Sequence, residues 1–191
     1  GSSAESVENV CLKCHERGRR LYWRGSAHES RNITCTNCHT LHKKAEFPQP
    51  GLRHLERPLE TRLLRKQTSV ELCLQCHLLQ KALLKRSSHM PLREGKLTCV
   101  DCHNPHGTAT PKLLTDNSVN ENCYRCHAEK RGPFLWEHPP VAENCLNCHE
   151  AHGSLHAALL KMRPPRLCQR CHMRAGHSTL PQPATNRLIY N

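Results

Sequence analysis

The sequence is poor in large apolar and aromatic side chains. Its 191 residues include only two Trp, three Tyr and two Phe, and the mean hydropathy is -0.69. A chain with so few large hydrophobic residues cannot easily bury enough apolar surface to form an ordinary core. The composition therefore leaves three classes open: a disordered chain, a chain crosslinked by disulfides, and a chain organised around a group that is not protein.

Long hydrophobic runs are also missing. No apolar run approaches the roughly 20 residues that a membrane-spanning helix needs, and no secretory signal core is visible. We therefore expect no transmembrane helix of its own. Residues 1–6, "GSSAES", are interpreted as an N-terminal tail, either a processed end or an expression remnant.

Acidic residues are few relative to basic ones, which gives a formal charge of +12. The basic residues are scattered, and aromatic side chains for base stacking are scarce, so we expect no nucleic-acid partner. If each bound ferric haem with two histidine ligands contributes a charge of about -1, seven of them would bring the total near +5. The basic excess then largely compensates haem propionates.

All 14 cysteines lie in CxxC pairs, and a histidine directly follows every pair. The pattern C-x-x-C-H is typical of c-type haem attachment, in which two thiols bond to the porphyrin and the adjacent histidine binds iron. Zinc sites and disulfides are the alternatives, but neither requires a histidine after each of seven pairs. We therefore predict seven covalently attached haem c groups at Cys11, Cys14, Cys35, Cys38, Cys73, Cys76, Cys99, Cys102, Cys123, Cys126, Cys145, Cys148, Cys168 and Cys171.

The motifs are arranged as a repeat that carries two haems in each unit. Each unit reads CxxCH, a linker with a histidine, CxxCHxxH and a Leu-rich stretch. The complete units are 11–66, 73–114 and 123–160, and 168–191 is a half unit. We expect residues 7–191 to form a single elongated heptahaem domain.

The histidines fall into three groups by their place in this repeat. The predicted proximal ligands are His15, His39, His77, His103, His127, His149 and His172. Seven others occupy repeat positions and are predicted distal ligands of neighbouring haems: His28, His42, His89, His106, His138, His152 and His177. His54 and His156 fall outside the repeat and are interpreted as bystanders. The sequence alone leaves open which distal histidine serves which haem.

The fold expected from these features is mostly irregular, with short α-helices, little or no β-sheet, and a haem chain as its organising centre. Helical turns are predicted around the CxxCH motifs and at residues 154–162, "SLHAALLKM". Prolines break the linkers into extended segments.

The C-terminal third resembles the periplasmic multihaem cytochromes of the DmsE and MtrA type. The linker "KRGPFLWEHPPV" and the pattern "HGS…LL…RPP" carry this resemblance, whereas CxxCH alone is specific only for haem. The resemblance implies distal ligation by His138, His152 and His177. It also implies low-potential haems with two histidine ligands, in a chain between redox partners, in some members inside an outer-membrane porin-type barrel. Such relatives usually carry ten haems, whereas seven motifs are present here.

We therefore expect an electron-transfer protein and not an enzyme. It would relay electrons in the periplasm, or towards or through the outer membrane, between a redox-protein donor and acceptor. Two alternatives stay open at this point: a multihaem reductase with one open iron, for which His177 is the place to look, and a subunit of a haem filament.

Overall fold

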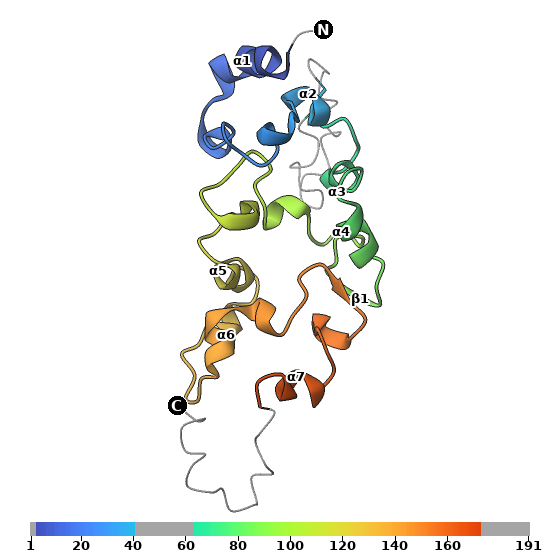
Figure 1. Ribbon diagram of the computed structural model, residues 1–191, viewed down its shortest axis with the longest axis vertical. Coiled ribbons are helices and arrows are strands. Elements are labelled where there is room, and N and C mark those ends of the chain that lie inside the picture. Colours follow the sequence, from blue (N-terminus) through green and yellow to red (C-terminus); the bar gives the residue numbers. More distant parts are fainter. Residues whose placement is uncertain (1–2, 41–62, 173–191) are drawn as a thin grey trace, which may run out of the picture.

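The computed structural model describes residues 3–40 and 63–172. These residues form an elongated arrangement, with helix α1 (Ala4–His15) near one end and α7 (Arg166–Gln169) near the other (Figure 1). Helix α1 begins at Ala4, so it starts within residues 1–6, which were interpreted as an N-terminal tail. His42, His54 and His177 lie outside the described residues.

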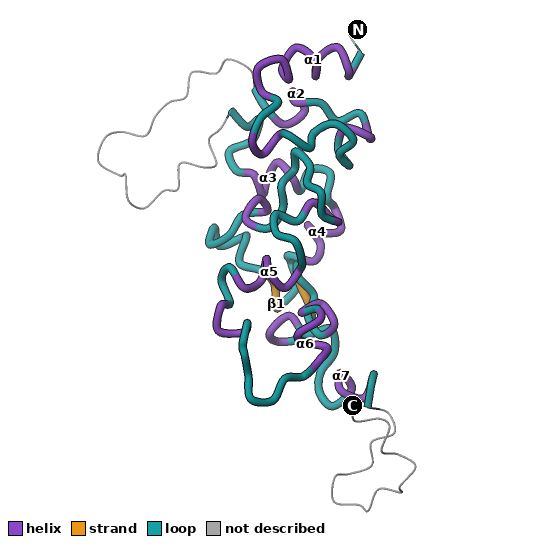
Figure 2. Tube along the Cα trace, turned by 90° about the vertical axis from the view of Figure 1, so that its left-hand side faces the viewer, coloured by secondary structure: helices purple, strands orange, loops and turns teal. Residues whose placement is uncertain are grey.

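Short helices and loops make up the described chain, and the loops dominate (Figure 2). The remaining α-helices are α2 (Cys35–Cys38), α3 (Ser69–Cys73), α4 (Leu78–Leu83), α5 (Val119–Tyr124) and α6 (Pro139–Glu143). The single-turn 3-10 helices are η1 (Gly18–Arg20), η2 (Glu29–Arg31), η3 (Cys99–Asp101), η4 (Pro111–Leu113), η5 (Ala128–Lys130), η6 (Cys145–Asn147) and η7 (Ala157–Leu159). The predicted fold class is therefore confirmed.

The helices before two of the motifs begin at hydroxyl caps. Thr68 accepts a hydrogen bond from the backbone N–H of Glu71 at 3.1 Å, and Ser118 accepts one from Glu121 at 3.1 Å. Such caps satisfy backbone donors that the first turn leaves unpaired. Local sequence therefore fixes where the turn that leads into the CxxCH motif begins.

One two-stranded antiparallel sheet connects two repeat units. Strand β1 (Ser88–His89) pairs with β2 (Gly153–Ser154), with Ser88 opposite Ser154. The backbone N–H of Met90 also donates to the carbonyl of His152 at 3.3 Å. This pairing brings the linker of the second unit beside the HxxH segment of the third.

The region predicted to be helical at 154–162 is only partly so. It contains the single turn η7, in which Ala158 has a left-handed conformation with φ 52°. A regular helix is excluded there because a left-handed residue breaks the run of helical dihedral angles.

Protein side chains build almost no hydrophobic core in the described residues. Only Leu12, Trp23 and Leu84 are buried hydrophobic residues. More polar side chains than apolar ones are buried, including Asn104, Asn120 and Asn122. The asparagines are therefore part of the packed interior, where polar groups need hydrogen-bond partners.

Two of these buried asparagines bond to the backbone of distant segments. The side-chain amide of Asn120 donates to the carbonyls of Val141 and Ala142 at 3.0 and 2.9 Å. Its oxygen accepts from the N–H of Cys145 at 2.7 Å. Asn104 similarly donates to the carbonyl of Arg19 at 2.7 Å. Polar contacts of this kind hold the motifs in place where apolar packing is sparse.

Candidate haem-binding sites

Each CxxCH motif is folded into one helical turn. In six motifs the N–H of the histidine donates to the carbonyl of the first cysteine, at 2.9–3.0 Å. The first motif lies within α1, which ends at His15. Both thiols and the histidine therefore come from a single turn, as attachment to one porphyrin requires.

In two units, the histidine of the first CxxCH motif lies beside the linker histidine of the preceding unit. The ring centroids of His28 and His77 lie 6.1 Å apart, and those of His138 and His172 lie 6.1 Å apart. Two metal–imidazole bonds of about 2.0 Å each, plus the distance from each nitrogen to its ring centre, add up to about 6 Å. The residues present therefore fit an iron held between each pair.

Two histidines of second motifs face the HxxH histidine of the following unit. His39 and His106 stack with centroids 6.1 Å apart, and His103 and His152 stack with centroids 6.2 Å apart. These distances again match one metal ion between two imidazoles. Four of the predicted proximal histidines are thus each brought beside one predicted distal histidine from another repeat unit.

The buried rings of these pairs favour the neutral form that binds metal. Burial lowers the pKa of His106 to about 4, and the neighbouring His39 lowers it further. Burial also lowers the pKa of His77 and of His152, with smaller contributions from His28 and His103 respectively. A neutral imidazole is the form that ligates iron.

Other predicted ligands are not paired in this way. His89 donates through Nδ1 to the carbonyl of Arg86 at 2.8 Å, and its Nε2 lies 3.0 Å from the carboxylate of Glu94. The hydrogen bond to Glu94 raises the pKa of His89. His127 lies 3.4 Å from the carboxylate of Glu129. No ring contact joins His89 or His127 to another histidine within the described ranges.

His156 differs from the other described histidines in its surroundings. Its Nδ1 atom is buried and has no hydrogen-bond partner. Its backbone N–H donates to the hydroxyl of Ser154 at 3.0 Å. Residues 3–40 and 63–172 place no second histidine ring against it, and its interpretation as a bystander stays a prediction.

The first cysteines of the two motifs in each complete unit are in contact. Cys35 contacts Cys11, and burial together with this neighbour raises the pKa of the Cys35 thiol to about 11. Burial, with a contribution from Cys145, raises the pKa of Cys123 to about 11. In the middle unit the contact with Cys99 raises the pKa of Cys73.

Cysteines of successive units also lie close enough to influence one another. Burial raises the pKa of Cys38, and Cys73 and Cys76 contribute to that shift. Burial likewise raises the pKa of Cys102, with a contribution from Cys126. The attachment points therefore follow one another in space in their sequence order, from the first motif to the sixth.

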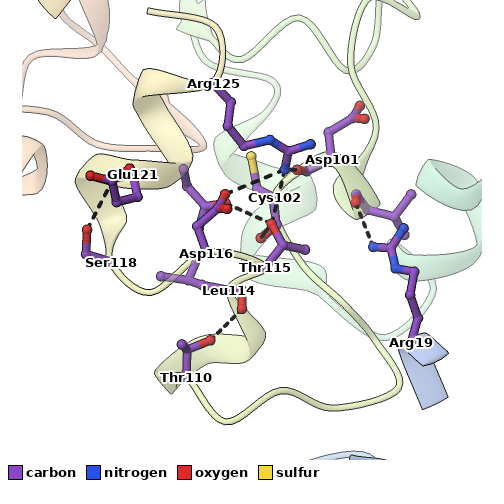
Figure 3. Close-up of polar contacts among 12 residues, drawn as sticks. Arg19, Asp101, Cys102, Thr110, Leu114, Thr115, Asp116, Ser118, Glu121 and Arg125 are labelled. Atoms are coloured by element: carbon purple, nitrogen blue, oxygen red, sulfur yellow. Dashed lines mark hydrogen bonds and ion pairs between the residues drawn. The ribbon is translucent and has the colours of Figure 1, made fainter. Parts of the chain in front are cut away.

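Two arginines from neighbouring segments form hydrogen bonds to the backbone of the fourth motif (Figure 3). The guanidinium of Arg125, from the fifth motif, donates to the carbonyl of Asp101 at 2.6 Å and to the hydroxyl of Thr115 at 3.2 Å. It also lies 3.7 Å from the carboxylate of Asp116. Arg19 donates to the carbonyl of Val100 at 3.3 Å. Charged donors thus bind backbone oxygens at the motif and fix the spacing of segments.

Sequence reasoning missed the role of the glycine that follows two of the predicted distal histidines, His106 and His152. A Cβ at Gly107 would lie 1.9 Å from the carbonyl oxygen of Tyr22, and one at Gly153 would lie 2.0 Å from that of Leu83. Only glycine permits so close an approach of two backbones. The repeated dipeptide His-Gly in the sequence is the signal that could have found it.

Replacing Gly153 by alanine should therefore displace the neighbouring His152. We expect a loss of about 3 kcal/mol in the free energy of unfolding, the upper end of the range for overpacking, because the methyl group has to push the Leu83 backbone away. Guanidinium unfolding of the haem-loaded protein measures this change. Gly95→Ala is the control: its Cβ meets nothing within 4 Å and its only cost is the left-handed φ of 68°, about 1 kcal/mol. Equal losses in the two variants would contradict the close-packing explanation.

Disulfides, clustered metal ligands and membrane-spanning helices are absent from the residues that the structure describes. None of the 14 cysteines forms a disulfide. Across the described ranges, no group of three or more His, Cys, Asp or Glu side chains is arranged to hold a metal ion by itself. In the same residues no helix is long and apolar enough to cross a membrane.

Comparison with known proteins agrees with the motif pattern. The family model for the doubled CXXCH motif matches residues 89–132 and 138–177. The chain is 48% identical, over 178 residues, to the multiheme cytochrome MtrA of Shewanella baltica strain OS185. That alignment covers 93% of this chain and 49% of the relative, so the chain spans about half of the relative's length. The CXXCH motifs indicate covalently bound haem c, and these findings together support a multihaem c-type cytochrome similar in sequence to MtrA.

Proposed function

We propose that the chain is a heptahaem electron relay in which two histidines bind each iron. The four ring pairs about 6 Å apart carry this proposal. When bound, the haems supply one-electron redox chemistry with no coordination position left for a substrate. The chain itself supplies the ligands, their orientation and the order of the attachment points.

The paired residues follow a rule that extends to the rest of the repeat. The iron bound by the first CxxCH histidine of a unit takes its second ligand from the linker histidine of the preceding unit. The iron bound by the second CxxCH histidine takes its second ligand from the HxxH histidine of the following unit. The rule pairs His127 with His89. His42 and His177 then remain as the repeat-position histidines for the proximal His15 and His149.

Hydrogen bonds of the distal histidines support this assignment. His28 contacts the carbonyl of Pro105 through Nδ1 at 2.8 Å, which leaves Nε2 as the nitrogen available to an iron. The Nδ1 of His106 lies 3.3 Å from the side-chain oxygen of Asn104. Such contacts fix the tautomer and the orientation of a metal-binding imidazole.

The proposal extends to location and partners. Covalent attachment of haem to CxxCH is typical of proteins matured outside the cytoplasm, so we place the chain in the periplasm. A redox-protein donor and acceptor would bind near the two ends of the relay. An outer-membrane porin-type barrel is a further partner in this proposal, as the resemblance of the C-terminal repeat to the DmsE and MtrA type of cytochrome implies.

Redox titration of the haem-loaded chain tests the proposed function. The oxidised protein should take up seven electrons, one for each CxxCH motif, and its electron paramagnetic resonance spectrum should contain only low-spin ferric haem. A variant with Cys99→Ala and Cys102→Ala lacks the fourth attachment site and should take up six electrons. Electron exchange along the chain should also be slower, because one haem of the relay is missing.

A reductase is the second candidate, and one observation directs attention to the fifth motif. There His127 and its expected partner His89 each contact a carboxylate and not each other. A stoichiometric high-spin ferric signal in the unaltered protein would reveal an open iron and would replace the relay proposal by the reductase.

A further inference from the structure

The Leu-rich segment after the second motif of a unit contains consecutive residues in the left-handed conformation. Lys112 and Leu113 have φ of 59° and 58°, and the equivalent Ala158 and Leu159 have φ of 52° and 58°. In the first unit Leu63, the equivalent of Leu113 and Leu159, is also left-handed, with φ 55°. None of these residues is glycine or asparagine, the types that adopt this conformation most readily. The surrounding structure must therefore hold the turn in place.

Backbone hydrogen bonds on both sides fasten the turn to the haem motif. In the second unit the N–H of Asn104 donates to the carbonyl of Leu113 at 2.8 Å, and that of Thr115 donates to the carbonyl of Cys102 at 3.0 Å. The hydroxyl of Thr110 also donates to the carbonyl of Leu114 (Figure 3). The third unit forms the same two backbone bonds, Glu150 to Leu159 at 2.7 Å and Lys161 to Cys148 at 2.9 Å.

The turn directs one carbonyl oxygen at the proximal histidine. The carbonyl of Lys112 lies 2.8 Å from Nδ1 of His103, and the carbonyl of Ala158 lies 2.7 Å from Nδ1 of His149. A carbonyl can only accept, so Nδ1 carries the proton and Nε2 is left as the iron ligand. In each turn the first of the two left-handed residues is the one whose carbonyl makes the contact.

Proximal histidines of first motifs have no such arrangement. Nδ1 of His127 lies 3.4 Å from the Glu129 carboxylate, and both side chains are about three-fifths exposed. For His15, His77 and His172 the structure gives no hydrogen bond to a ring nitrogen from any described residue. The short backbone contact is therefore a feature of the second motif and its turn.

We propose that this left-handed turn is a positioning element that lowers the reduction potential of the haem bound by His103 and of the haem bound by His149. A strong hydrogen bond from Nδ1–H to a fixed carbonyl makes the imidazole a more basic ligand, and a more basic ligand stabilises ferric over ferrous iron. The inference rests on the proposed function, since it takes both histidines as iron ligands.

A matched pair of substitutions at Ala158 tests this inference. Ala158 is exposed, so a larger side chain meets no packing. Valine strongly disfavours a positive φ, whereas glycine adopts it freely. In a redox titration of the haem-loaded chain, Ala158→Val should raise the reduction potential of one haem. The expected rise is about a tenfold change in the reduction equilibrium of that haem, which corresponds to about 59 mV for one electron. Ala158→Gly should titrate like the unaltered protein.

The equivalent pair Lys112→Val and Lys112→Gly repeats the test on the haem bound by His103. Unchanged titrations in both valine variants, with the low-spin spectrum retained, would overturn the inference and leave the proposed function intact. A high-spin signal in a valine variant would also overturn it, because the turn would then only hold the histidine on the iron. A high-spin signal in the unaltered protein would instead contradict the proposed function.

Discussion

Replacing His152 by alanine is expected to convert one low-spin haem into a high-spin haem. The ring of His152 is stacked on that of His103 at a centroid distance of 6.2 Å, and burial lowers its pKa. Alanine offers no donor atom. The pairing of Gly153 with His89 in the sheet and the close approach of Gly153 to the backbone of Leu83 leave little freedom for another ligand to enter. Electron paramagnetic resonance should show a high-spin ferric signal that accounts for one of seven haems, and that haem should bind carbon monoxide when reduced.

The matched control for this prediction lies four residues further along. His156→Ala removes a histidine from the same stretch of chain, but the repeat assigns it no iron. Its spectrum should stay entirely low-spin. A high-spin signal from His156→Ala, or a fully low-spin spectrum from His152→Ala, would reverse the roles given to these two residues.

The chain without attached haem is expected to be unfolded. Burial of a large apolar side chain contributes roughly 1.5–3 kcal/mol, and only Leu12, Trp23 and Leu84 are buried hydrophobic residues in the described chain. Ordering the backbone costs about 1–2 kcal/mol for every residue. Three side chains cannot offset that cost over residues 3–40 and 63–172, so the haem contacts have to supply the difference.

Expression in a cytoplasm without haem attachment provides the material for this measurement. The haem-free chain should give a far-ultraviolet circular dichroism spectrum of an unfolded polypeptide and no cooperative thermal transition. The haem-loaded chain, measured beside it, should show the signal of its short helices and should unfold cooperatively. A sharp transition in the haem-free chain would show that the protein side chains alone specify the fold.

The sequence by itself determines the chemistry of this protein. Seven CxxCH motifs indicate haem c because two thiols and an adjacent histidine at this spacing meet the requirements of one porphyrin. The short helices and the near absence of sheet also follow from the sequence, since few apolar residues are available to build layers and prolines interrupt the linkers. Within residues 3–40 and 63–172, the repeat identified both members of each histidine pair that the structure forms.

Only the tertiary structure decided which of these residues meet. His28 lies beside His77, 49 residues away along the chain, because the linker of one unit folds onto the first motif of the next. The left-handed turns at Lys112 and Ala158 could not be read from residue types that usually avoid that conformation. The pairing of the histidines and the left-handed backbone of these turns both depend on contacts between segments distant in sequence. Local patterns such as CxxCH carry no information about those contacts.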